Sequence, residues 1–182
     1  IRGLDDAPEK LFYRSVYLDT VQLARVLTGL PNGGIPTLYA TGGSQGGALA
    51  IACAALEPSV RRAAPLFPFL CDYQRVWELD LANNAYAELA QYFRAFDPLH
   101  EREADVFTRL GYIDCQHLAP RIQAEVLMGM TLMDTTCPPS TQFAAYNKIT
   151  APKQRVVYPD FAHEATPGWV DRVMQFFVGD GG

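Results

Sequence analysis

The sequence has few of the features that mark a nucleic-acid or membrane protein. Its 15 Lys and Arg residues are outnumbered by 20 Asp and Glu residues, and no basic run is present. The net charge of -5 argues against nucleic-acid binding, because neutralising phosphates needs clustered cations. No apolar stretch reaches the roughly 18–20 residues that a membrane span needs. We therefore expect neither nucleic acid nor membrane among the partners of this chain.

Cysteine is also scarce. The chain contains four cysteines, far apart and without a CxxC pair: Cys53, Cys71, Cys115 and Cys137. This spacing argues against structural zinc, and a chain of 182 residues needs no disulfide framework. With 49% hydrophobic and 19% charged residues, the composition supports a packed core. We predict one domain with free, buried thiols.

The apolar pattern predicts strands alternating with helices. Helices are expected over residues 12–27, 47–56 and 167–178, and Pro31-Asn32-Gly33-Gly34 breaks the first of them. Strands are expected near residues 37–41, 62–67, 124–130 and 154–158. Such alternation implies an α/β fold with a mostly parallel sheet.

Residues 70–122 interrupt this alternation. They have a mixed, helical pattern that includes Trp77, Leu89 and Phe93. The stretch is too long for a plain crossover between two strands. We interpret it as an inserted helical cap or an oligomer surface.

The segment Gly42-Gly43-Ser44-Gln45-Gly46 fits the pattern G-x-S-x-G. In this pattern the serine lies on a sharp turn between a strand and a helix, where only small neighbours fit beside it. The N-terminus of the helix stabilises developing negative charge. A predicted strand precedes the segment and a helix rich in small residues follows it, which favours Ser44 as a nucleophile over a plain glycine-rich turn.

A nucleophilic serine needs a base, and the base needs an orienting acid. In an α/β-hydrolase the acid and then the histidine follow the serine along the chain. His163 lies in the loop after the last predicted strand, where the base belongs, whereas His100 and His117 lie in the helical excursion. Asp134 follows the preceding predicted strand, and Asp160, in the same loop as the histidine, is the alternative acid. We predict Asp134 and His163 as acid and base.

Several separate motifs resemble those of one known family. They are Gly42-Gly43-Ser44-Gln45-Gly46-Gly47, Pro68-Phe69-Leu70-Cys71, Asp134-Thr135-Thr136-Cys137-Pro138-Pro139-Ser140-Thr141, Phe143-Ala144-Ala145-Tyr146-Asn147 and His163-Glu164. Their order and spacing, from about Arg2 to Phe177, are similar to those of the acetyl xylan esterase and cephalosporin C deacetylase family, carbohydrate esterase family 7. The resemblance implies an α/β-hydrolase fold with Ser44 as nucleophile, Asp134 as acid and His163 as base.

The sequence departs from that family ahead of the serine. The family has an Arg-Gly-Gln motif and several strands there, and neither is present; Arg2-Gly3-Leu4 resembles a later Arg-Gly of the family. We therefore expect residues 1–182 to be the C-terminal part of one α/β-hydrolase domain. The strand before Ser44 then has an open edge, which a missing N-terminal segment of the same protein would cover. The backbone N–H of Gln45 is one oxyanion donor, and the second would come from that segment.

The resemblance implies a serine esterase that removes acetyl groups from O-acetylated sugars, short xylo-oligosaccharides and related small acetyl esters. No metal or organic cofactor is implied. Residues 70–122 would narrow the pocket, and Cys137 either lines it or is an inert buried thiol. By resemblance the protein is a cytoplasmic homo-oligomer, a ring-like hexamer. Two other classes stay open: another α/β-hydrolase, such as a peptidase or lipase-like esterase, and a non-catalytic fragment.

Overall fold

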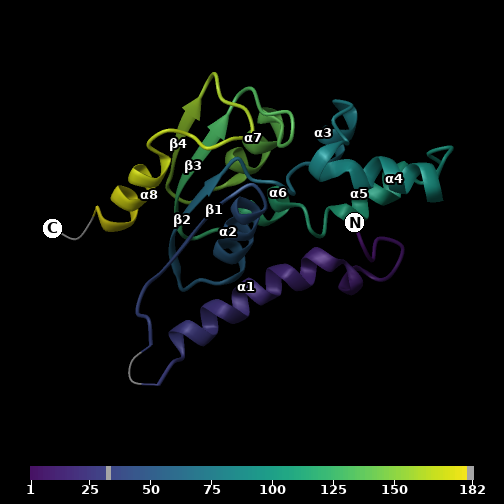
Figure 1. Ribbon diagram of the computed structural model, residues 1–182. Coiled ribbons are helices and arrows are strands. Elements are labelled where there is room, and N and C mark those ends of the chain that lie inside the picture. The colour runs from purple at the N-terminus through teal and green to yellow at the C-terminus, as the bar shows by residue number, and fades with distance from the viewer. Residues whose placement is uncertain (32–33, 180–182) are drawn as a thin grey trace.

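The computed structural model describes residues 1–31 and 34–179, which are built around a four-stranded parallel sheet (Figure 1). The strands lie side by side in chain order: β1 (Leu38–Gly43), β2 (Val60–Leu66), β3 (Glu125–Thr131) and β4 (Lys153–Tyr158). All three pairings are parallel, so the carboxyl ends of the strands lie at the same end of the sheet. The four predicted strands are confirmed, with ends that differ by at most two residues.

The predicted helices outside the excursion are also confirmed, as α1 (Phe12–Thr28), α2 (Gln45–Leu56) and α8 (Trp169–Val178). Helix α2 begins two residues earlier than predicted, directly after Ser44. Helix α8 begins two residues later, because Gly168 caps it in a left-handed conformation with φ +67°. The sequence did not predict α7 (Pro139–Lys148), whose apolar spacing is weak. Two residues of the predicted helix break, Asn32 and Gly33, lie outside the described residues.

The side chains of the central strands alternate between two buried clusters. On β3, Val126, Met128 and Met130 belong to the larger cluster, and Leu127 between them belongs to the smaller one. Helix α8 covers the face of the smaller cluster, and α2 and α7 lie on the other face, with α1 packed outside α2 (Figure 1). This period of two is the pattern of strands buried on both faces.

Residues 70–122 fold into short helices. They are α3 (Tyr73–Glu78), η2 (Asn84–Tyr86), α4 (Ala87–Phe96), α5 (Glu103–Leu110), α6 (Cys115–Leu118) and η3 (Ala119–Arg121), where η marks a 3₁₀-helix. Trp77 packs against Phe93 with their ring centroids 4.6 Å apart, which joins α3 to α4. In Figure 1, α3, α4 and α5 lie together to one side of the sheet. The stretch is therefore helical, and its interpretation as a cap stays a prediction.

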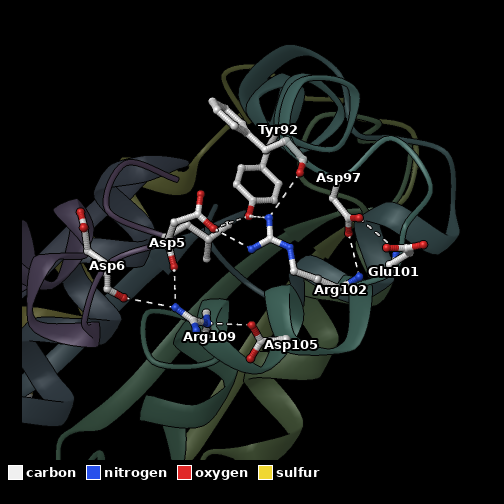
Figure 2. A network of polar contacts seen from close by, with 10 residues as sticks. Asp5, Asp6, Tyr92, Asp97, Glu101, Arg102, Asp105 and Arg109 are labelled. Carbon is white, nitrogen blue, oxygen red and sulfur yellow. Dashed lines mark hydrogen bonds and ion pairs between the residues drawn. The ribbon is translucent and has the colours of Figure 1, made fainter.

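A polar network ties this helical stretch to the start of the chain (Figure 2). The Arg102 guanidinium donates to Asp5 Oδ1 at 3.2 Å, and the Tyr92 hydroxyl donates to the same oxygen at 2.6 Å. Arg109 donates to the backbone carbonyl oxygen of Asp6 at 3.3 Å. Burial and the neighbouring Asp5 carboxylate raise the pKa of Tyr92. Because the ion pair between Arg102 and Asp5 is exposed, water and salt screen it, and it adds little to the free energy of unfolding.

Strand β1 lies at an edge of the sheet and pairs with β2 alone. Within residues 1–31 and 34–179, no strand lies on its other side. A groove of about 390 Å³ runs between α1, α2 and this edge, lined by Leu23, Leu27, Tyr39 and Leu49 among others. The side chains of Leu23 and Tyr39 are 60% and 43% exposed, so apolar surface surrounds the open edge. The expectation of an uncovered edge is confirmed for the part of the chain that is described.

None of the described helices combines the length and the apolar character needed to cross a membrane.

Candidate active site

Ser44 lies on the turn between the end of β1 and the start of α2. Its backbone has φ +55° and ψ −117°, a combination that a residue with a side chain rarely adopts. The Ser44 N–H donates to the Leu66 carbonyl at 3.0 Å, and its carbonyl accepts from Ala48 and Phe69, both at 3.0 Å. These three hydrogen bonds hold a conformation that costs of order 1–3 kcal/mol. The strained turn predicted from the G-x-S-x-G pattern is present.

Two glycines let the turn close. A Cβ added at Gly42 would lie 2.6 Å from the carbonyl carbon of Gly46, and one added at Gly47 would lie 2.8 Å from the Leu66 carbonyl oxygen. A Cβ at Gly46 would meet nothing within 4 Å. The expectation that only small residues fit around the serine is therefore wrong for Gly46, because this residue faces open space.

Asp134 lies in the loop after β3 and is buried, with 1% of its surface exposed. Its Oδ1 accepts hydrogen bonds from the backbone N–H groups of Thr136 and Cys137, both at 2.8 Å. The Thr131 hydroxyl donates to Oδ2 at 3.4 Å. A buried carboxylate needs such donors, since its charge has no water to stabilise it.

The loop after β4 brings His163 to this carboxylate. The Nδ1 of His163 lies 2.8 Å from Asp134 Oδ2. When Asp134 is ionised it can only accept, so Nδ1 carries the proton and Nε2 is free to take one. The alternative acid, Asp160, is exposed. The structure therefore joins the predicted acid and base, although their catalytic roles stay a prediction.

The other two histidines lie away from this pair. His100 has its Nδ1 3.2 Å from Glu103 Oε2 and lies beside Trp77 and Phe93. His117 is exposed on α6. These contacts of His100 involve neither Asp134 nor Ser44.

Cys137, in the loop that carries Asp134, lies beside Ser44. Cys137 is fully buried, and its thiol lies beside the Ser44 hydroxyl. Burial, and then the nearby Asp134 carboxylate, raise the pKa of this thiol well above its ordinary value, which keeps it neutral. The structure shows the buried free thiol that one alternative expected, whereas a place for Cys137 in the lining of the pocket stays a prediction.

Asp134, Cys137 and His163 together form a donor set that could hold a metal ion, with their ligand atoms within 4.8 Å of one another. A metal on these atoms would have to replace the hydrogen bond between Asp134 and His163. We therefore assign no metal to this cluster.

Gln45 is the first residue of α2. Its N–H group has no acceptor within the helix, because the first four N–H groups of a helix never do. The helix dipole adds partial positive charge at the same place. The group can therefore donate to an anionic oxygen beside Ser44, and its role as an oxyanion donor stays a prediction.

Two residues that the sequence did not single out support the site. Phe67 directly follows β2, and the centroid of its ring lies 4.7 Å from that of the His163 ring. Gln142 on α7 is fully buried and bonds to the backbone of both Thr131 and Cys137. No sequence signal existed for either residue, because the apolar spacing of α7 is weak and its buried face also includes Thr141.

A parallel sheet with the serine turn after β1, the acid after β3 and the histidine after β4 defines an α/β-hydrolase. The sequence profile of the acetyl xylan esterase (AXE1) family matches residues 1–180, and the chain belongs to this family.

Individual relatives agree with this assignment. The acetyl esterase Axe7A of Xylanibacter ruminicola is 31% identical over 164 residues, which are 90% of this chain and 35% of that protein. Acetyl xylan esterase 1 from Thermoanaerobacterium sp. JW/SL YS485 is 54% identical with a TM-score of 0.95, over 98% of this chain and 56% of that one. An acetyl xylan esterase from Paenibacillus sp. R4 is 40% identical with a TM-score of 0.92, over 97% and 55%. The chain thus spans about a third to just over half the length of these relatives.

Proposed function

We propose that the protein containing this chain is a serine carboxylic-ester hydrolase that deacetylates O-acetylated xylan, short xylo-oligosaccharides and related small acetyl esters, including cephalosporin C-like ones. Family membership and the relatives named acetyl xylan esterases support the substrate class. The observation that carries the chemistry is the 2.8 Å contact between Asp134 and His163, in the same site as the strained Ser44 turn. The same family match favours this function over a peptidase, a lipase-like esterase or a non-catalytic fragment.

The catalytic sequence follows from these groups. His163 Nε2 takes the proton of Ser44, and the Ser44 oxygen attacks the acetyl carbonyl carbon to form a tetrahedral oxyanion. Asp134 holds the imidazole tautomer and stabilises the imidazolium, while the Gln45 N–H donates to the oxyanion. The oxyanion collapses, and the sugar alcohol leaves with the proton from His163. Water, deprotonated by His163, then releases acetate from Ser44.

The second oxyanion donor belongs to the part of the protein outside this chain. In the α/β-hydrolase fold this donor comes from a loop after an early strand. The open edge of β1 and its apolar groove support a neighbouring segment there. Losing one such donor typically lowers kcat by about 10²–10³. Residues 1–182 alone would therefore be much less active than the assembled protein.

The resemblance to carbohydrate esterase family 7 also supports a cytoplasmic homo-oligomer, a hexamer. The outer face of α8 supports this oligomer, because Val170, Met174 and Val178 are 70%, 58% and 68% exposed and a neighbouring subunit would cover them. Residues 70–122 serve in this proposal as a cap that favours short acyl groups.

Replacing the nucleophile tests the proposed function. In the assembled protein, Ser44→Ala should abolish acetate release from acetylated xylo-oligosaccharides and from 4-nitrophenyl acetate while the fold stays intact. A fluorophosphonate probe should label the parent protein at Ser44 and leave the variant unlabelled. Hydrolysis by the variant within tenfold of the parent would rule out Ser44, and cleavage of peptide substrates in preference to acetyl esters would favour the peptidase alternative.

A further inference from the structure

Phe67 directly follows β2 in a conformation that its side chain disfavours. Its φ is +31°, in the region that bulky residues rarely occupy. The Phe67 N–H donates to the Gly129 carbonyl of β3 at 2.9 Å, which holds the backbone in place. Strain of this kind persists only where the surrounding structure imposes it, and it gathers at functional sites. The position of this ring is therefore imposed by the fold.

The strained backbone directs the Phe67 ring between the two halves of the candidate site. On one side the ring lies 4.7 Å from the His163 imidazole, with an angle of 51° between the ring planes. On the other side it borders Gly43, where an added Cβ would lie 3.4 Å from Phe67 Cε2. Only 7% of Phe67 is exposed. The ring thus contacts the predicted base and the residue before the predicted nucleophile.

His163 has few other restraints. Its side chain is 28% exposed, and its hydrogen bond to Asp134 fixes the distance between two atoms. One such bond still allows the imidazole to turn about the line from Nδ1 to Oδ2. Contact with a fixed aromatic ring removes this freedom, because aromatic pairs favour tilted and offset packing at this separation.

We propose that Phe67 is a positioning residue, which holds the plane of the His163 imidazole so that Nε2 faces Ser44. The proposal rests on the proposed function, since it assumes that His163 is the base. Phe67 acts through His163 and forms or breaks no bond itself.

The test compares Phe67→Leu with Phe67→Tyr in the whole protein. Leucine fills much of the space without an aromatic face, whereas tyrosine keeps the face. We expect Phe67→Leu to lower kcat for 4-nitrophenyl acetate about tenfold, with KM within about twofold; a full 1 Å displacement can cost ~10². Phe67→Tyr should keep kcat within about threefold of the parent. Phe176→Leu, the same change at a half-buried residue that packs against this cluster and has no ring contact with His163, should leave kcat unchanged.

A spectroscopic readout separates this proposal from the proposed function. The ring current of Phe67 shifts the imidazole proton resonances of His163, so Phe67→Leu should move them and Phe176→Leu should not. If Phe67→Leu leaves both kcat and these resonances unchanged, or if Phe67→Tyr fails to restore kcat, the positioning role is wrong. If the parent protein hydrolyses no ester but the resonances still move, the proposed function fails while the ring contact stands.

Discussion

The loop that carries Asp134 and the loop that carries His163 meet at one hydrogen bond, but they are built differently. The acid loop, residues 131–137, begins at buried Thr131 and ends at buried Cys137. Gln142 connects its two ends by accepting from the Thr131 N–H at 3.2 Å and donating to the Cys137 carbonyl at 2.6 Å. The base loop, residues 159–168, is mostly exposed or half-buried, and within it Glu164 accepts from the Ala162 N–H at 3.0 Å.

This difference follows from the charge that each loop holds. A buried carboxylate is stable only when fixed donors surround it, so its loop must be rigid before the imidazolium forms. In the proposed mechanism His163 changes its charge and must reach Ser44, the substrate and water. Its position therefore depends on partners from other elements, namely Asp134 and Phe67. Hydrogen bonds from its own backbone and from the Gln142 amide hold the acid loop. Contacts with residues of other elements, Asp134 and Phe67, hold the base loop.

The largest expected effect comes from removing the charge of the acid. Asp134→Asn keeps the shape of the loop but favours the wrong imidazole tautomer, so kcat should fall by about 10⁴. Asp160→Asn, a matched change in the base loop, should alter kcat by less than about twofold, because Asp160 is exposed. Acetate release by the assembled variants measures both. A larger loss in the Asp160 variant would overturn the choice of acid.

An intermediate effect is expected from the amide that closes the acid loop. Gln142→Leu leaves the Thr131 N–H and the Cys137 carbonyl buried without this partner, which costs about 1–3 kcal/mol per group in the free energy of unfolding. The thermal midpoint should fall, and kcat should fall about tenfold because the backbone that carries the donors to Asp134 loses its support. Asn147→Leu, on the exposed face of α7, should change stability by less than about 0.5 kcal/mol. Equal midpoints for the two variants would show that the acid loop is not held by Gln142.

The smallest effect should come from the base loop itself. Glu164→Ala removes the acceptor of the Ala162 N–H, but water replaces it because both residues lie near the surface. We expect a loss of stability below about 0.5 kcal/mol and a change in kcat below about threefold. Steady-state kinetics and thermal unfolding measure these. A loss of stability as large as that of Gln142→Leu would show that the base loop depends on its own hydrogen bond as strongly as the acid loop depends on Gln142.

The sequence determined the features that depend on local chemistry. Short apolar stretches between helical segments located β1 to β4 to within two residues, because strands of a parallel sheet that are buried on both faces form continuous apolar runs. The Gly42–Gly47 segment predicted a strained turn, because a Cβ at Gly42 or Gly47 would collide with the backbone. The order of serine, acid and histidine, together with family motifs, selected Asp134 and His163 before any distance was known.

The tertiary structure alone decided which side chains meet across elements. No periodicity relates Phe67 to His163, or Cys137 to Ser44, because such contacts depend on how parallel strands place their following loops at one end of a sheet. Helix α7 and its buried Gln142 were also invisible, since the amide is satisfied only by backbone groups that folding brings to it. The chemistry of each residue is thus encoded locally, whereas the support that orients it comes from segments far apart in the chain.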